Sequence, residues 1–203
     1  MVYFDFDGTL TDVWERFYRI FQDASAITGI TFEAYVSAKK RIPQDGALAA
    51  AFGAVLPDDY RDKKRSMLES AEYLAFDRLI VPAERICAFF QQHDCRILTN
   101  RRNPHNFKIQ LSALGLGALT DRCIVLNPDA KITKAQYLSN AHPHEKVILV
   151  GDAEAESQAA QSDSVKVYLV RTGLRAPELI PFSDRCEIID SVSDFINAFK
   201  ESV

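Results

Sequence analysis

Short apolar runs that alternate with helical patterns are the feature that most constrains the fold of this chain. The five clearest runs are Val2–Phe6, Arg96–Thr99, Cys123–Leu126, Val147–Val150 and Val165–Val170, and Cys186–Ile189 is a weaker sixth. Each run is only a few residues long, and three are rich in Val and Ile, which is typical of strands covered on both faces. Strands that alternate with helices favour an α/β fold with a mostly parallel sheet.

Helical patterns fill most of the intervals between these runs. The expected helices are Ala83–Gln92, Phe107–Leu114, Lys134–Asn140, Glu154–Gln161 and Ser193–Lys200. Gly115 suits the end of the second of these helices, and Thr133 is a candidate N-cap for the third. The prediction is therefore a sheet flanked by helices.

One long interval, from Val13 to Leu79, shows helical periodicity and no convincing strand. Its first segment carries aromatic residues at i, i+3, i+4 and i+7, which form one face of a helix. The further helical segments are Tyr35–Lys40, Gly46–Phe52 and Asp59–Leu74, with breaks at Pro43 and Pro57. We therefore expect an all-helical insertion directly after the first strand and its loop.

Two carboxylates, Asp5 and Asp7, stand at the end of the first apolar run and are followed at once by Gly8 and Thr9. Ligands of open α/β sheets bind beyond the carboxyl ends of the strands, so a site is expected here. Acids held this close raise one another's pKa unless a cation intervenes, and carboxylate oxygens are ligands that Mg²⁺ prefers. An Asp-rich solvated turn is the alternative interpretation of such a pattern.

The segment from Asp5 to Thr11 resembles the first motif of the haloacid dehalogenase (HAD) superfamily, in which two aspartates are separated by one residue. Thr99, at the end of the next core strand, matches the hydroxyl residue of the second motif. Gly151 and Asp152, after the fourth apolar run, resemble the Gly-Asp pair of the fourth motif, with Glu156 where the family more often has Asp. Glu154 is an alternative acid that we expect on an exposed helix surface.

The motif lysine of the family has two candidates, Lys134 and Lys131. Lys134 is favoured because a capped helix starting at Thr133 places it in the first turn. A lysine there is poorly placed for the helix dipole, which suggests a functional reason for it. Lys131 remains a rival, because the interval from Lys134 to Asp152 is about one helical turn shorter than in many relatives.

The resemblance implies a Rossmann-like parallel sheet flanked by helices, formed by residues 1–12 and 80–203, with a helical cap of the C1 type at residues 13–79. It implies a Mg²⁺-dependent phosphatase in which Asp5 forms an aspartyl-phosphate and Asp7 serves as general acid and base. It also implies that Thr99 and Lys134 bind the phosphoryl group.

The same resemblance implies the ligand sets. The metal would be held by Asp5, Asp7 (through its backbone carbonyl), Asp152 and Glu156. Gly8, Thr9 and Asn100 would lie at the phosphoryl group.

The expected insertion carries a basic cluster, Lys39, Lys40 and Arg41, before the Pro43 break. In C1-capped relatives a loop in this part of the cap contacts the substrate, and the stretch after the cluster is similar to that of β-phosphoglucomutase-like members. The cluster is therefore a candidate substrate-binding group, and a solvated basic turn is the alternative. Arg101 and Arg102, which follow Thr99, are candidates for contact with a second anionic group, but surface arginines at a helix start are the favoured interpretation.

The phosphoglycolate phosphatase and β-phosphoglucomutase-like branch of the superfamily is the best match, so the expected substrate is a small phosphorylated metabolite. A phosphomutase shares every core motif and is the alternative. An inactive regulatory protein on the same scaffold is a third hypothesis, which the presence of Asp5, Asp7 and Asp152 disfavours.

Composition and charge limit the classes of partner and the cellular location that we expect for this chain. The net charge of -4 gives no electrostatic reason to expect nucleic-acid binding. No apolar stretch is long enough to span a bilayer, and no signal-peptide pattern is present, so a cytoplasmic protein is expected. The four cysteines are scattered without a C-x-x-C pair, which indicates free thiols rather than a disulfide framework or a zinc site.

Overall fold

A computed structural model describes residues 1–199 and shows a central sheet of six parallel strands. The strand order is β5-β4-β1-β6-β7-β8. The strands are β1 (Val2–Phe4), β4 (Cys95–Asn100), β5 (Cys123–Leu126), β6 (Val147–Gly151), β7 (Val165–Val170) and β8 (Glu187–Ile189). The predicted α/β fold with a parallel sheet is confirmed, and the end of the expected last helix, Lys200, lies outside the described residues.

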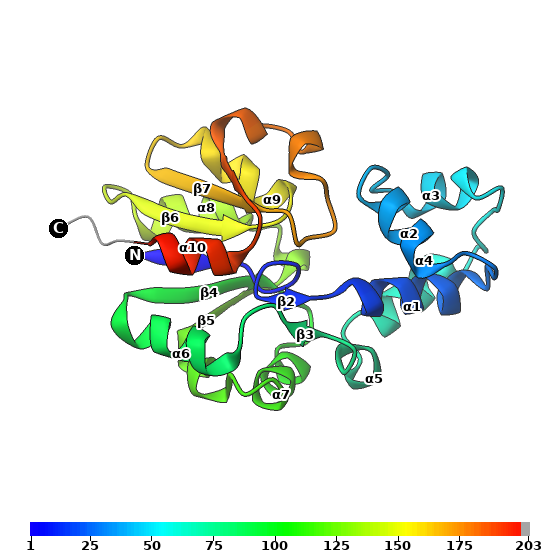
Figure 1. Cartoon of the computed structure of the whole chain (residues 1–203), viewed down its shortest axis with the longest axis horizontal. Coiled ribbons are helices and arrows are strands. Elements are labelled where there is room, and N and C mark those ends of the chain that lie inside the picture. The colour runs from blue at the N-terminus through cyan, green and yellow to red at the C-terminus, as the bar shows by residue number, and fades with distance from the viewer. Residues whose placement is uncertain (200–203) are drawn as a thin grey trace.

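Helices cover both faces of this sheet, as its apolar strands require (Figure 1). Helices α6 (Ala83–Gln92), α7 (Pro104–Ala113) and α10 (Val192–Ala198) pack on the face that carries Phe4. Helix α8 (Lys134–Ala141) and the segment α9–η3 (Glu154–Ser157 and Gln158–Gln161) pack on the face that carries Tyr3. Successive strand residues point to opposite faces, so each face has its own core. Short 3₁₀ segments lie at Gly117–Arg122 (η1), Pro128–Ala130 (η2), Pro177–Leu179 (η4) and Ser183–Arg185 (η5).

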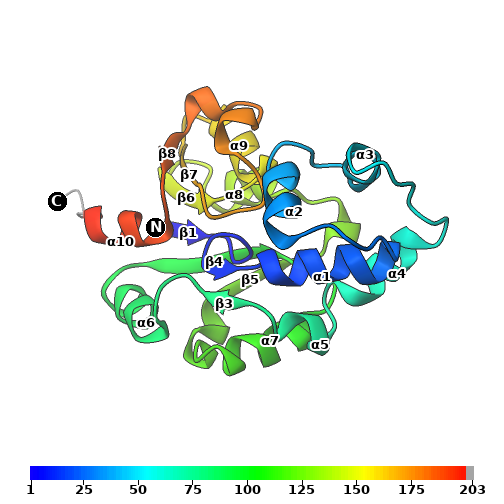
Figure 2. The same cartoon turned by 45° about the vertical axis from the view of Figure 1, so that its right-hand side comes forward.

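The helical insertion follows the first strand, as predicted. Its helices are α1 (Trp14–Ser25), α2 (Phe32–Lys39), α3 (Asp45–Ala51), α4 (Tyr60–Met67) and α5 (Ala71–Leu74). Helices α1 to α4 share a small core of their own, which includes Trp14, Phe21, Tyr35, Leu48 and Tyr60. Figures 1 and 2 show the insertion on the side of the sheet where the parallel strands end.

A two-stranded antiparallel ribbon connects the sheet to the insertion. It pairs β2 (Thr11–Asp12) with β3 (Arg78–Leu79), so Thr11 lies opposite Leu79. The expectation of no strand between Val13 and Leu79 is therefore wrong for its last two residues. A strand of two residues is too short to show an alternating pattern, so its pairing comes from tertiary contacts alone.

Several boundaries differ from the prediction, and the expected helix Asp59–Leu74 is divided into α4 and α5. Strand β1 ends at Phe4 rather than Phe6, although Asp5 still donates its N–H to the carbonyl of Val150 at 2.8 Å. Helix α7 begins at Pro104 rather than Phe107, because Asn103 caps it by accepting the N–H of Asn106 and Pro104 supplies the fixed φ of a first turn.

Candidate active site

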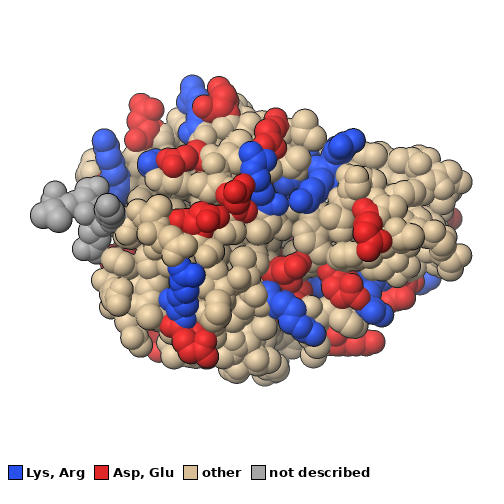
Figure 3. All heavy atoms as spheres, in the orientation of Figure 1, with Lys and Arg blue, Asp and Glu red and all other residues tan. Residues whose placement is uncertain are grey.

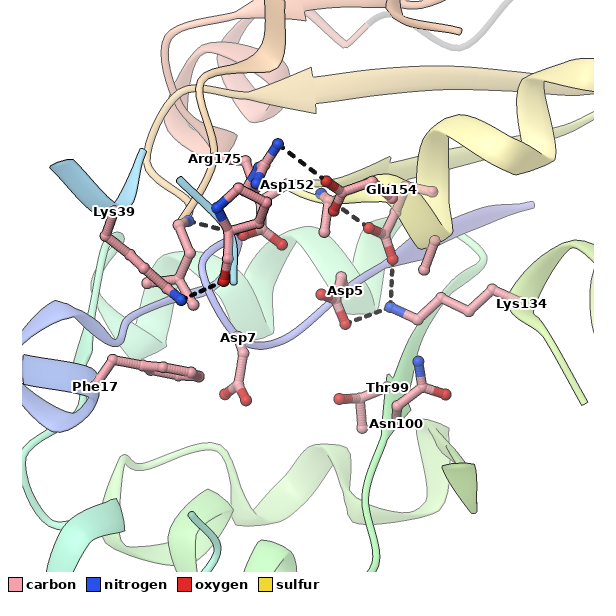
Figure 4. Close-up of a pocket in the computed structure, with 15 residues that line it drawn as sticks. Asp5, Asp7, Phe17, Lys39, Thr99, Asn100, Lys134, Asp152, Glu154 and Arg175 are labelled. Carbon is pink, nitrogen blue, oxygen red and sulfur yellow. Dashed lines mark hydrogen bonds and ion pairs between the residues drawn. The ribbon is translucent and has the colours of Figure 1, made fainter. Parts of the chain in front are cut away.

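A cavity of about 320 Å³ opens between the carboxyl ends of the core strands and the helical insertion (Figure 4). Its lining comes from both parts of the chain. The residues are Asp5, Asp7, Phe17, Lys39, Pro43, Thr99, Asn100, Lys134, Asp152, Ala153, Glu154, Ala155, Glu156, Leu174 and Arg175. The residues predicted at the ends of three different strands therefore share one cavity.

Lys134 lies between two carboxylates at the floor of this cavity. Its Nζ atom is 2.5 Å from Oδ1 of Asp5 and 2.5 Å from Oε1 of Glu156, and its side chain is 2% exposed. Helix α8 places it there because Thr133 caps the helix in a reciprocal capping box with Gln136, as the sequence predicts for Thr133. The rival Lys131 is exposed and adopts a left-handed φ of 58°.

The protonation of this pair follows from burial and charge. Burial raises the pKa of Asp5 to about 6, against the opposing effect of the Lys134 ammonium. Burial alone would lower the pKa of Lys134, but the carboxylates of Asp5 and Glu156 raise it above its ordinary value. At neutral pH the pair is therefore a carboxylate beside an ammonium group.

Three buried carboxylates, those of Asp5, Asp152 and Glu156, form a cluster with one oxygen of each within 4.8 Å of the others. Burial, followed by repulsion from Asp5 and Glu156, raises the pKa of Asp152 well above its ordinary value. With all three carboxyls ionised, Lys134 alone leaves an uncompensated negative charge in a buried place, and an oxygen-coordinated divalent cation would balance it. The donor set therefore fits Mg²⁺.

Backbone contacts hold the acids of this cluster. Glu156 accepts the N–H of Ala153 at 3.0 Å through its second oxygen, and Asp152 accepts the N–H of Leu174 at 3.2 Å. Gly8 has a φ of +76°, and a Cβ at this position would overlap the Asp152 carboxylate. The glycine of the first motif is thus needed for the close approach of two loops.

Asp7 is held by two arginines instead of pointing into the carboxylate cluster. Its Oδ1 atom is 2.6 Å from Nη2 of Arg101 and 2.9 Å from Nη2 of Arg16. Burial alone would raise the pKa of Asp7, but Arg101 and Arg16 lower it below its ordinary value. The prediction that Arg101 lies on the surface is wrong, since the residue is 3% exposed, whereas Arg102 is exposed as expected.

The two arginines belong to a buried network that joins the core to the insertion. Nε of Arg16, on α1, is 3.0 Å from Oδ1 of Asp77, and Gln110, on α7, donates to Oδ2 of Asp77 at 2.6 Å. Nη2 of Arg101 also lies 3.4 Å from Oε1 of Gln110. Burial raises the pKa of Asp77 to about 7, with Arg16 opposing this.

The remaining predicted residues divide into those that reach the cavity and those that do not. Thr99 is buried and Asn100 exposed, and both line the cavity at the end of β4. Gly8 and Thr9 do not line it: their backbone N–H groups bond to the carbonyls of Thr11 and Phe6 within the turn, at 2.8 Å and 3.4 Å.

Only one residue of the basic cluster reaches the cavity. Lys39 lines it, but Nζ of Lys39 lies 2.6 Å from Oδ1 of Asp45 and 2.6 Å from the carbonyl oxygen of Pro43. Lys40 lies over the ring of Trp14, and Arg41 is exposed. The three residues of the basic cluster therefore lie in different environments, and Lys39 is already paired with Asp45 inside the insertion.

Several site residues were not foreseen from the sequence. Arg16, Asp77, Gln110 and Arg175 have no local pattern that marks them, because each acts through a partner far away in the chain. Arg101 had one usable signal, its position two residues after Thr99 at a strand end. Glu154, which the sequence places on an exposed surface, lines the cavity and lies beside Arg175, with 3.3 Å between Oε1 and Nη2.

No family model matches this chain, and no curated protein matches its sequence. Several solved structures are similar to it over nearly the whole length. A haloacid dehalogenase-like family hydrolase from Streptococcus pneumoniae has a TM-score of 0.68 at 16% identity, covering 98% of this chain and 97% of the other.

Two further structures agree with this comparison. A predicted phosphatase from Clostridium acetobutylicum has a TM-score of 0.68 at 16% identity, covering 97% of this chain and 95% of that one. A HAD family hydrolase from Deinococcus radiodurans, with bound phosphate and sodium, has a TM-score of 0.67 at 15% identity, covering 96% and 92%. At these identities the likeness concerns the fold.

Proposed function

This chain has the fold of HAD-like hydrolases, and we propose that it is a phosphatase of that superfamily. Its reaction would be the Mg²⁺-dependent hydrolysis of a small phosphorylated metabolite through an aspartyl-phosphate at Asp5. The observation that carries the proposal is the placement of Asp5 and Lys134, 2.5 Å apart, beside Asp152 and Glu156 at the floor of a cavity. A nucleophile, a fixed positive charge and a cation site are the parts that phosphoryl transfer requires.

Asp5 is the nucleophile in this proposal. Its carboxylate attacks phosphorus and displaces the alcohol of the ester, and water then attacks the aspartyl-phosphate to release inorganic phosphate. Lys134 keeps the Asp5 carboxylate ionised and offsets the negative charge of the phosphoryl group. Thr99 and Asn100 line the cavity at the end of the neighbouring strand and would donate hydrogen bonds to phosphoryl oxygens.

Asp7 moves the protons in both steps. Its carboxylate, held by Arg101 and Arg16, is suited to take a proton from the hydrolytic water. Protonation of the leaving alcohol requires Asp7 to carry a proton first, so its contact with Arg16 on the insertion has to loosen at that stage. The movement of the insertion and the protonation of Asp7 are coupled in this way.

Asp5, Asp152 and Glu156 would hold Mg²⁺, with the backbone carbonyl of Asp7 as an expected further ligand. When bound, this ion supplies charge stabilisation to the transferring phosphoryl group. The pKa of Asp152, raised by burial and by its acidic neighbours, supports a role for this cluster in cation binding.

Residues 13–79 act as a cap domain over a core of residues 1–12 and 80–203 in this proposal. Phe17, Lys39 and Pro43 contribute to the cavity from the insertion, so its movement would open and close the site. A closed cap excludes water from a reactive intermediate and selects the substrate by shape.

The cavity size and the surface charge support a small-molecule substrate. A volume of about 320 Å³ is at the lower end of ligand pockets, which span roughly 300–1,000 Å³. Figure 3 shows basic and acidic side chains interspersed on the visible face, without the basic stripe that nucleic-acid binding requires. None of the described helices has the length and apolar character needed to cross a membrane.

The test is phosphate release from a panel of phosphorylated sugars, nucleotides and small acids, with Mg²⁺ or with EDTA, beside the variant Asp5→Asn. Release that requires Mg²⁺ and is lost in the folded variant supports the proposal. A folded wild-type protein that releases no phosphate from any substrate contradicts it, and formation of an isomeric sugar phosphate instead would identify a mutase.

A further inference from the structure

Arg175 is a buried cation of the cavity whose hydrogen-bonding capacity is largely unused. The residue is 9% exposed and belongs to the loop after β7. Its Nη2 atom lies 3.3 Å from Oε1 of Glu154, while Nε and Nη1 have no hydrogen-bond partner among the described residues. Unpaired buried donors on a charged group are costly, so such a group calls for an explanation.

The backbone around Arg175 is fixed on both sides. The N–H of Leu174 donates to Oδ2 of Asp152 at 3.2 Å, and the N–H of Ala176 donates to the carbonyl of Lys40 at 3.1 Å. Gly173 also packs so closely on Asp152 that a Cβ there would overlap its carboxylate. Arg175 is therefore anchored between the carboxylate cluster and the insertion, and Figure 4 shows its guanidinium beside Asp152 and Glu154.

The other two cations that line the cavity are already paired. Lys134 is shared by Asp5 and Glu156, and Lys39 bonds to Asp45 and to the carbonyl of Pro43. Of the three, only Arg175 has side-chain nitrogen atoms without any hydrogen-bond partner in the part of the chain that the structure describes. A guanidinium group presents its donors as a planar fork that matches the two oxygens of a carboxylate or phosphate.

We propose that Arg175 forms a second anion subsite in the cavity, which binds a carboxylate or phosphate group of the substrate other than the one that reacts at Asp5. The substrate class is then a phosphate monoester with a second oxyanion. The inference rests on the proposed function, because only an enzyme has a substrate. Anion binding at the subsite can nevertheless be measured without turnover.

The binding test uses phosphonates, because their P–C bond resists hydrolysis by a phosphatase. Phosphonoacetate, 3-phosphonopropionate and propane-1,3-diphosphonate carry a second anion at different spacings. Ethylphosphonate, propylphosphonate and butylphosphonate are the matched probes without one. Affinities are measured by calorimetry on the full chain in Mg²⁺. We expect at least one probe with a second anion to bind roughly 10- to 100-fold more tightly than its partner, since a charge-assisted hydrogen bond is worth about that factor.

Two variants locate the effect. Arg175→Gln should reduce that affinity ratio to about one, and Arg175→Lys, which keeps the charge without the fork, should give an intermediate value. Arg171→Gln is the matched control, because Arg171 lies on the same loop but is exposed and pairs with Glu178 and Asp190. The control should keep the wild-type ratio, including any contribution from Mg²⁺ chelation by the probes.

Turnover separates this inference from the proposed function. Phosphate release from 2-phosphoglycolate and from ethyl phosphate is compared in the same proteins. An Arg175-dependent affinity ratio without phosphate release supports the subsite and contradicts the phosphatase proposal. A wild-type ratio near one for all three probe pairs, or a ratio that Arg175→Gln leaves intact, overturns the subsite.

Discussion

Arg101 and Asp7 form a partly buried ion pair, with 2.6 Å between Nη2 and Oδ1, that links the end of the second core strand to the proposed general acid and base. Arg16, from the helical insertion, contacts the same carboxylate oxygen at 2.9 Å. One carboxylate is thus oriented by both parts of the chain. Its position depends on how the insertion lies on the core, so in the proposed mechanism a movement of the insertion would influence proton transfer.

Replacement of Arg101 should impair proton transfer more than phosphoryl binding. We expect Arg101→Gln to lower kcat by about 10- to 100-fold for alkyl phosphates, which need protonation of the leaving group, within the range that acid–base catalysis supplies. Aryl phosphates, whose leaving groups need little protonation, should lose much less. Arg102→Gln is the control, because Arg102 is exposed and pairs with Asp129. Equal losses for alkyl and aryl substrates would indicate a general structural defect instead.

Lys134 and Lys131 should differ sharply when each is replaced. Lys134→Met leaves Asp5 and Glu156 as an uncompensated buried pair, so we expect loss of turnover and a decrease of about 3–5 kcal/mol in the free energy of unfolding without Mg²⁺. Lys131→Ala, at an exposed site, should change neither quantity measurably. Urea denaturation and phosphate release on both variants test this, and an inactive Lys131→Ala beside an active Lys134→Met would reverse the assignment.

Mg²⁺ should stabilise the folded protein through the carboxylate cluster. At a concentration about 100-fold above Kd, binding contributes roughly 2.7 kcal/mol, which raises Tm by several degrees for a chain of this size. EDTA should reverse the increase, and Asp152→Asn should abolish it. Calorimetric melts with Mg²⁺, with EDTA and with Na⁺ at matched ionic strength measure the effect. An Asp152→Asn protein that keeps the full shift would place the ion elsewhere.

Asp77 should make stability depend on pH in a defined direction. Its pKa is about 7 in the folded chain, against an ordinary value of 3.8 that we take for the unfolded chain. The folded chain therefore binds more protons than the unfolded chain between about pH 4 and pH 7. The free energy of unfolding therefore falls as pH rises through this window.

Asp77→Asn should remove this contribution. The difference between wild type and variant, measured by urea denaturation across that window in EDTA, should change by a few kcal/mol at most, since one pKa unit corresponds to about 1.4 kcal/mol. Asp5 and Asp152 remain in both proteins and cancel in the comparison. A pH-independent difference would show that Asp77 is ionised throughout.

The local structure was largely predictable. Hydrophobic periodicity and helix caps are properties of neighbouring residues, so Ala83–Gln92, Cys123–Leu126 and Val165–Val170 have the predicted bounds in the structure. The ribbon of β2 and β3 was not predicted, because a strand of two residues is too short to show the alternation of apolar and polar residues. Helix α7 begins before its predicted start at Phe107, because Asn103 and Pro104 provide a cap and a first turn that precede its apolar periodic residues.

The sequence by itself determined the α/β alternation, the helical insertion and the order in which polar residues follow the strands, because parallel strands bring their carboxyl ends to one edge of a sheet. Only the tertiary structure decided which charged side chains meet there. Lys134 rather than Lys131 reaches Asp5, and Arg101 turns inward to Asp7 with Arg16. Arg175 is buried beside Glu154. Long charged side chains have many rotamers, and packing between distant elements selects one of them, so their partners cannot be read from local pattern.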